Sequence, residues 1–139
     1  KSRSMTPEAI IQRMLEKDAF SQWMQLEVLE IRLGYCKLKM TVSPEMVNGF
    51  LIAHGGITYS LSDSALAFAS NSYGKQCVSI ETSISHTRPV KIGDTLISTC
   101  TELHRGKTIG IYEVVIHNQE EKLVALFKGT VHISDREWS

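Results

Sequence analysis

Five residues that could carry chemistry stand close together, in the order Asn48, His54, Gly55, Gly56 and Asp63. The stretch after the glycines is apolar or small at nearly every position, and Asp63 is its single charged residue. Burying a carboxylate among such side chains is unfavourable unless a partner group compensates. An isolated acid in this setting is therefore a candidate for chemistry.

The glycine pair and the acid suit different parts of one reaction. A helix beginning at Gly55 presents unpaired backbone N–H groups and a partial positive charge, which stabilise negative charge developing on an oxygen. Asp63 suits a general base acting on water, or a nucleophile that attacks directly. His54 is placed to donate to a carbonyl oxygen, and Asn48 to hold the loop or to orient the acid or the water. These roles indicate acyl transfer to water.

The spacing of the two groups has a geometric consequence. Asp63 lies about 12 Å beyond Gly55 along a helix that rises 1.5 Å per residue. One helix does not bring both groups against one scissile carbon, whereas two antiparallel copies do. The spacing predicts a homodimer in which the Gly55 N–H of one copy faces Asp63 of the other.

Structural explanations compete for each residue taken alone. Two glycines before a helix commonly form only a turn, His54 could be a satisfied structural histidine, and Asp63 could be a buried acid bonded to backbone. Their combination in one span favours chemistry. The three scattered cysteines, Cys36, Cys77 and Cys100, are interpreted as buried reduced thiols, since they form neither a disulfide framework nor a zinc pattern. A catalytic cysteine has no local support.

The elements that must position these residues follow from apolar periodicity and from breakers. A long central helix is predicted from Gly55 to about Tyr73, and a first amphipathic helix from Thr6 to about Asp18. Strands are predicted at Gln25–Leu33, Cys36–Val42, Gln76–Arg88, Asp94–His104, Lys107–His117 and Lys122–Ile133.

This order of elements predicts an α+β fold. Two helices are too few for the crossovers of a parallel sheet. The last four strands are joined by short connections and are expected to pair in sequence as an antiparallel meander. We expect a curved antiparallel sheet of about five to six strands wrapped around one long central helix, plus a short N-terminal helix. A long edge strand commonly pairs with a second copy, so the sheets of a homodimer are expected to join edge to edge.

Length and charge narrow the class of protein. The 139 residues suit one domain with one core, and residues 1–139 are interpreted as a single domain in which Lys1–Ser4 are a cloning remnant. Fifteen Lys and Arg balance fifteen Asp and Glu, which does not support a nucleic-acid or acidic-membrane partner. No apolar run would span a membrane and no signal-peptide core is evident, so a cytoplasmic protein is expected.

These motifs resemble the hotdog-fold acyl-CoA thioesterases, and most closely the phenylacetic-acid-degradation (PaaI) type. The resemblance covers the chain from about Phe20 to Ile133. It rests on Asn48-x5-His54-Gly55-Gly56-x6-Asp63, then Asn71-Ser72-x-Gly74, Arg88-Pro89-x3-Gly93-Asp94-Thr95-Leu96 and Arg105-Gly106-Lys107-Thr108.

The resemblance implies hydrolysis of an acyl-CoA thioester. It implies Asp63 as base or nucleophile, the Gly55 N–H as oxyanion donor, and His54 and Asn48 as assisting residues. Ser79 aligns with a hydroxyl that helps to place water in some members, with an ordinary strand surface as the competing explanation. Members use no metal or redox cofactor, so coenzyme A enters only as part of the substrate. They usually assemble as dimers of dimers, so a homotetramer built from homodimers is expected.

Substrate contacts are also implied. Gly56 joins Gly55 at the substrate, and Arg88, Arg105 and Lys107 are candidates for binding the coenzyme A phosphates, with a solvated surface charge as the alternative for each. Residues 19–25, with their aromatic side chains, are a candidate lining for the acyl pocket, and core packing is the alternative. The resemblance leans toward an arylacetyl group, and the sequence does not define the acyl group further.

Rival functions fit less well. A hotdog dehydratase would resemble a His-Phe-Pro-rich loop, and no proline lies near His54. The hydroxybenzoyl-CoA thioesterase branch places its acid ahead of the helix, where this chain has none after Glu45. A non-catalytic acyl-CoA-binding or sensor module could dispense with Asp63, so the acid favours an enzyme. The five histidines lack the HExxH spacing of metal hydrolases.

Overall fold

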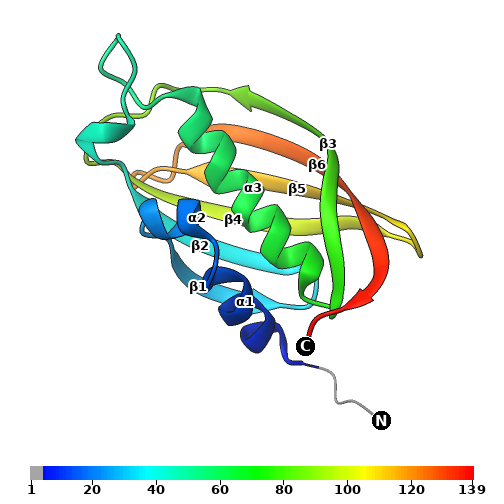
Figure 1. Cartoon of the computed structure of the whole chain (residues 1–139). Coiled ribbons are helices and arrows are strands. Elements are labelled where there is room, and N and C mark those ends of the chain that lie inside the picture. Colours follow the sequence, from blue (N-terminus) through cyan, green and yellow to red (C-terminus); the bar gives the residue numbers. More distant parts are fainter. Residues whose placement is uncertain (1–4) are drawn as a thin grey trace.

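One antiparallel sheet curves around a single long helix (Figure 1). The computed structural model describes residues 5–139, so the interpretation of Lys1–Ser4 as a cloning remnant lies outside the described residues. The helices are α1 (Pro7–Leu15), α2 (Ala19–Trp23), the 3-10 turn η1 (Pro44–Met46) and α3 (Gly55–Asn71). The strands are β1 (Glu27–Arg32), β2 (Tyr35–Thr41), β3 (Lys75–His86), β4 (Thr95–Arg105), β5 (Ile109–His117) and β6 (Leu123–Glu137). The predicted α+β class with a curved sheet around α3 is confirmed.

The N-terminal segment forms two helices rather than the single predicted one. The Thr6 hydroxyl caps α1 by accepting from the Ala9 N–H at 3.1 Å, as expected for a Thr-Pro start. The prediction that α1 runs to Asp18 was wrong. The Asp18 carboxylate accepts from the Ser21 N–H at 3.0 Å and so caps a second helix, α2.

The order of strands in the sheet is β1-β2-β4-β5-β6-β3. Strands β4, β5 and β6 form the predicted meander, but the expected pairing of β3 with β4 was wrong, because β3 pairs with β6. Residues 87–94 connect β3 to β4, which is too long for a tight hairpin, and they carry the chain to the β2 side of the sheet. There the Val42 N–H donates to the Asp94 carbonyl at 2.9 Å, and the Gly93 N–H donates to the Val42 carbonyl at 2.8 Å.

Helix α3 lies in the concave side of the sheet and contacts strands β2 to β6. It is buried on most sides because its residues are apolar or small, including the fully buried Leu61, Ala65 and Phe68. The fit is close on the β6 side, where a Cβ at Gly129 would lie 2.6 Å from Leu66 Cδ2. A helix held this firmly fixes the positions of the groups at both of its ends.

The two edges of the sheet are β1 and β3. Strand β3 exposes large apolar side chains, with Val78 63% and Ile80 57% accessible. Its register with β6 skips one residue between Ser79 and Glu81, so Ile80 forms a β-bulge. Strand β1 also carries an irregularity, between Val28 and Glu30.

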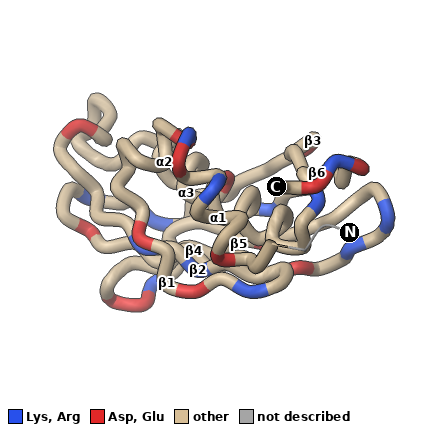
Figure 2. Tube along the Cα trace, turned by 60° about the horizontal axis from the view of Figure 1, so that its bottom comes forward, with Lys and Arg blue, Asp and Glu red and all other residues tan. Residues whose placement is uncertain are grey.

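Charged residues are scattered over helices, strands and turns (Figure 2). Among residues 5–139, no helix has the length and apolarity that crossing a membrane requires.

Candidate active site

The first turn of α3 has one backbone N–H without an acceptor among the described residues. The His54 ring caps the helix, and its Nδ1 accepts from the Gly56 N–H at 2.9 Å. Within residues 5–139, the Gly55 N–H donates to no acceptor. Helix N-terminal N–H groups need partners from outside the helix. The Gly55 N–H is therefore available to a ligand, and the Gly56 N–H is not while His54 holds it.

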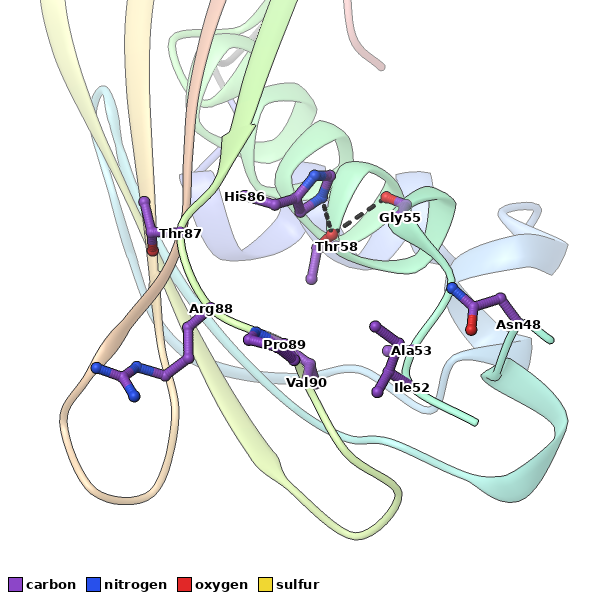
Figure 3. Close-up of a pocket in the computed structure, with 10 residues that line it drawn as sticks. All are labelled: Asn48, Ile52, Ala53, Gly55, Thr58, His86, Thr87, Arg88, Pro89 and Val90. Atoms are coloured by element: carbon purple, nitrogen blue, oxygen red, sulfur yellow. Dashed lines mark hydrogen bonds between the residues drawn. The ribbon is translucent and has the colours of Figure 1, made fainter. Parts of the chain in front are cut away.

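Gly55 faces a cleft of about 370 Å³ that Asn48, His86 and Arg88 also line (Figure 3). The Asn48 side chain accepts from the Phe50 N–H at 2.9 Å, which holds the loop ahead of the helix. Arg88 is exposed at the cleft. The structure thus brings together Gly55, Asn48 and one of the three predicted basic residues.

His86 is a member of this cleft that the sequence analysis did not predict. Its Nε2 lies 2.6 Å from the Thr58 hydroxyl, which also donates to the Gly55 carbonyl at 3.1 Å (Figure 3). A Cβ at Gly55 would lie 3.2 Å from His86 Cε1, so a side chain at this position would require the ring to move by a few tenths of an ångström.

The alternation of side chains along β3 is interrupted. An unbroken strand, which alternates with period two, would place Ser79, Glu81, Ser83 and Ser85 on one face. The bulge at Ile80 shifts this alternation. Beyond the bulge the even-numbered positions face α3, as the 2.8 Å contact of Thr82 with the Tyr59 hydroxyl shows.

Asp63 and Ser79 line a different cavity, of about 260 Å³, between α3 and β3. Burial raises the pKa of the Asp63 carboxyl, and the negative charge of Asp18 raises it further. Among the described residues, no hydrogen bond or ion pair to the Asp63 carboxylate is formed within the chain. A half-buried, unpaired carboxylate with a raised pKa is suited to accept a proton.

The Gly55 and Asp63 cavities share no lining residue. Each cavity holds one part of the predicted chemistry, which agrees with the separation of about 12 Å along the helix. Within one chain, Gly55 and Asp63 therefore lie in separate cavities.

Arg105 and Lys107 lie at the other end of α3. Arg105 Nη1 donates to the Ser70 carbonyl at 3.1 Å and to the Tyr112 hydroxyl at 2.9 Å, and its guanidinium stacks on the Tyr73 ring. A cation at this place neutralises the negative end of the helix dipole. These contacts give Arg105 a structural task, while Lys107 is exposed in the β4–β5 turn.

The residues 19–25 divide between the core and the surface. Met24 is 1% exposed and belongs to the core. Phe20 and Trp23 are half exposed, with ring centroids 5.5 Å apart, and they line a third cavity of about 340 Å³ together with His54 and Gly56. This cavity lies beside the first turn of α3.

The three cysteines are free and buried, as predicted. Burial raises the pKa of Cys36 to about 12 and that of Cys77 above its ordinary value. Thiols in this state are poor nucleophiles.

Comparisons with known proteins agree with this architecture. The family model of the thioesterase superfamily matches residues 50–125. The chain is 40% identical over 119 residues to the acyl-coenzyme A thioesterase PaaI of Escherichia coli (strain K12), covering 86% of this chain and 85% of that protein. The solved structure of E. coli PaaI matches with a TM-score of 0.93 and 36% identity, over 99% of this chain and 100% of the other. A hypothetical thioesterase of Streptococcus pneumoniae TIGR4, solved with coenzyme A, matches with a TM-score of 0.85 and 25% identity, over 91% and 98% of the two chains.

A curved antiparallel sheet around one long helix, with these matches, defines the hotdog fold. The chain belongs to the thioesterase superfamily and is a thioester hydrolase. The family resemblance inferred from the motifs is confirmed.

Proposed function

We propose that this protein hydrolyses acyl-CoA thioesters to a free acid and coenzyme A, at sites shared between two copies of the chain. The observation that carries the proposal is that, among residues 5–139, the Gly55 N–H faces one cavity without an acceptor and the Asp63 carboxylate faces another without a partner. The name of the E. coli relative and the coenzyme A in the S. pneumoniae structure support the substrate class.

The proposed reaction begins when the thioester carbonyl oxygen accepts a hydrogen bond from the Gly55 N–H. Asp63 of the partner subunit takes a proton from water, whose oxygen attacks the carbonyl carbon. The same carboxylate could instead attack directly and form an anhydride that water then hydrolyses. The helix N-terminus stabilises the oxyanion, and its collapse breaks the carbon–sulfur bond and releases the coenzyme A thiolate.

Assisting residues follow from the geometry. His54 Nδ1 accepts from Gly56, so a neutral ring carries its proton on Nε2 and can donate to a substrate oxygen. Asn48 shapes the loop at the cleft, Ser79 stands beside Asp63, and Arg88 is exposed where a coenzyme A phosphate could bind.

The second copy is proposed to add at β3. This strand is an edge with unpaired backbone groups and exposed apolar side chains, and it holds Ser79 beside the Asp63 cavity. Antiparallel pairing of two β3 strands joins the sheets and sets the helices antiparallel, which the shared site requires. Such dimers are proposed to assemble further into a homotetramer.

An aryl or medium-length acyl group, such as phenylacetyl, is the proposed substrate moiety. The aromatic pair Phe20 and Trp23 lines a cavity that reaches His54 and Gly56, beside the oxyanion donor. Aromatic side chains stack well on an aryl group.

Thiol release from a panel of aromatic, short, medium and long acyl-CoA esters tests the proposal. We expect hydrolysis to favour aryl or medium chains, and Asp63→Asn to lower kcat by about 10²–10⁴, as loss of a general base does. Asp135→Asn, at an exposed position on β6, is the matched control and should leave the rate unchanged. If no ester of the panel is hydrolysed, a non-catalytic acyl-CoA-binding module is favoured. If Asp63→Asn is fully active, Asp63 is excluded as the base.

A further inference from the structure

The hydrogen bonds of Thr58 assign a tautomer to His86. The Thr58 hydroxyl has one proton, which it donates to the Gly55 carbonyl at 3.1 Å. With that proton used, the Thr58 oxygen accepts in the 2.6 Å contact with His86, which assigns the ring proton to Nε2. In this neutral tautomer the second ring nitrogen, Nδ1, has a free lone pair, and among residues 5–139 no hydrogen bond is made to it. The cleft beside Gly55 thus contains a proton acceptor held in a fixed place.

Helix α3 and strand β3 run side by side in opposite directions, and their contacts form a series. His86 lies over Gly55, Thr82 contacts Tyr59, and Ser79 shares a cavity with Asp63. A two-fold axis that places Gly55 of one copy against Asp63 of the other also brings together the β3 residues that lie beside Gly55 and Asp63. His86 of one copy must then face Ser79 of the other.

The bulge makes this pairing consistent with the pleat of the strand. Directly opposite residues in an antiparallel pair point to the same face of the sheet. Ser79 and His86 both face α3 because Ile80 bulges out between them. Ile80 is bulged and does not count as a paired position. Ser83 is then the middle of the paired positions from Ser79 to His86, so the two-fold axis passes through Ser83.

We propose that His86 is a positioning residue of the shared site, a role that rests on the proposed function. Its Nδ1 accepts a hydrogen bond from the Ser79 hydroxyl of the partner subunit. This bond directs the serine lone pairs toward the water that Asp63 of the same partner subunit activates. His86 acts through Ser79 and the water, and it forms no bond to the substrate.

Replacement of the ring tests this role. His86→Phe keeps the ring volume over Gly55 and removes both nitrogens, and we expect kcat to fall about tenfold or more with little change in KM, as for an interaction made only in the transition state. His86→Asn restores an acceptor near the Nδ1 position and should recover part of the lost kcat. His132→Phe changes an exposed histidine of β6 and should have no effect. A rise in KM alone, or equal losses for Phe and Asn, would refute the positioning role.

Cysteine cross-linking tests the register that brings His86 to Ser79. In Ser83→Cys the two new thiols face each other across the axis, about 4.5–5.5 Å apart at Cβ, so mild oxidation should join the chains. In Ser85→Cys the thiols of the two copies are about 13 Å apart along the strands, so this variant should remain uncrosslinked. The three native cysteines are buried and free, and they provide the background. Cross-linking of Ser85→Cys in place of Ser83→Cys would overturn the proposed pairing.

Different results would exclude the shared hydrolytic site and the positioning role of His86. If Asp63→Asn abolishes turnover but the His86 variants remain fully active, the shared site is supported and the positioning role of His86 is excluded. If Asp63→Asn is fully active, Asp63 is not the base and the proposed shared site is excluded. If no ester of the panel is hydrolysed, the proposed hydrolysis itself is excluded.

Discussion

Two individually inactive variants should restore each other if the site is shared between subunits. Gly55→Pro removes the oxyanion N–H while leaving the helix intact, since proline is favoured at the first helical position and His54 already has the extended conformation that precedes proline. Gly55→Ala is its matched control. Both variants place a Cβ 3.2 Å from the His86 ring, and only the alanine keeps the N–H.

The magnitude follows from the two-fold arrangement. Loss of one oxyanion donor lowers kcat by about 10²–10³. Asp63→Asn is similarly impaired. A mixed dimer of Gly55→Pro with Asp63→Asn has one site that carries both changes and one that carries neither. Purified mixed dimers should therefore show about half of the wild-type activity per dimer.

Co-expression of the two variants with different affinity tags allows mixed dimers to be isolated and assayed by thiol release. The measured rate should exceed that of either parent by at least about tenfold. Activity no greater than the mean of the two parents would show that each site lies within a single chain. A site shared between Gly55 of one subunit and Asp63 of the other would then be excluded.

Two further predictions concern a charge and a close contact. Asp18→Asn keeps the side-chain cap of α2 but removes the charge that raises the pKa of Asp63, so the acid limb of the pH profile of kcat/KM should move to lower pH; an unchanged or upward-shifted limb would contradict this cause. Gly129→Ala places a Cβ 2.6 Å from Leu66 Cδ2 and should destabilise the protein by about 1–3 kcal/mol in chemical denaturation, as overpacking does. Gly49→Ala meets no atom within 4 Å and is the control, so equal stability losses for the two variants would refute the packing argument.

Local signals in the sequence were sufficient for the central helix and for the placement of Gly55 and Asp63 on it. The glycine pair, the apolar run and the single acid are contained in one stretch, and α3 begins at Gly55 as predicted. The separation of Gly55 from Asp63 depends only on helix geometry, so the division into two cavities could be anticipated. The cap at Asp18 was also local, but a polar residue next to a predicted helix end does not show whether the helix stops or a new one starts.

Features that depend on pairing between distant strands could not be predicted. The bulge at Ile80 exists only in the register of β3 with β6, and without it His86 would be assigned to the wrong face. Arg105 matched a motif, yet its contacts with Ser70 and Tyr112 arise because β4 ends and β5 begins beside the last turn of α3. The strand order was missed for the same reason, since chain proximity does not decide which edge of the sheet a strand joins.

In the proposed dimer, strand β1 would limit further growth of the sheet. Two copies joined through β3 would still leave one open edge at each end of the combined sheet, and open edges invite endless addition of chains. At β1 the ladder is broken by the irregularity near Val28, and Glu30 and Arg32 place an ion pair on the strand. Another copy would therefore meet charge and a misaligned backbone at β1, so growth of the proposed sheet would end after two chains instead of continuing into a fibre.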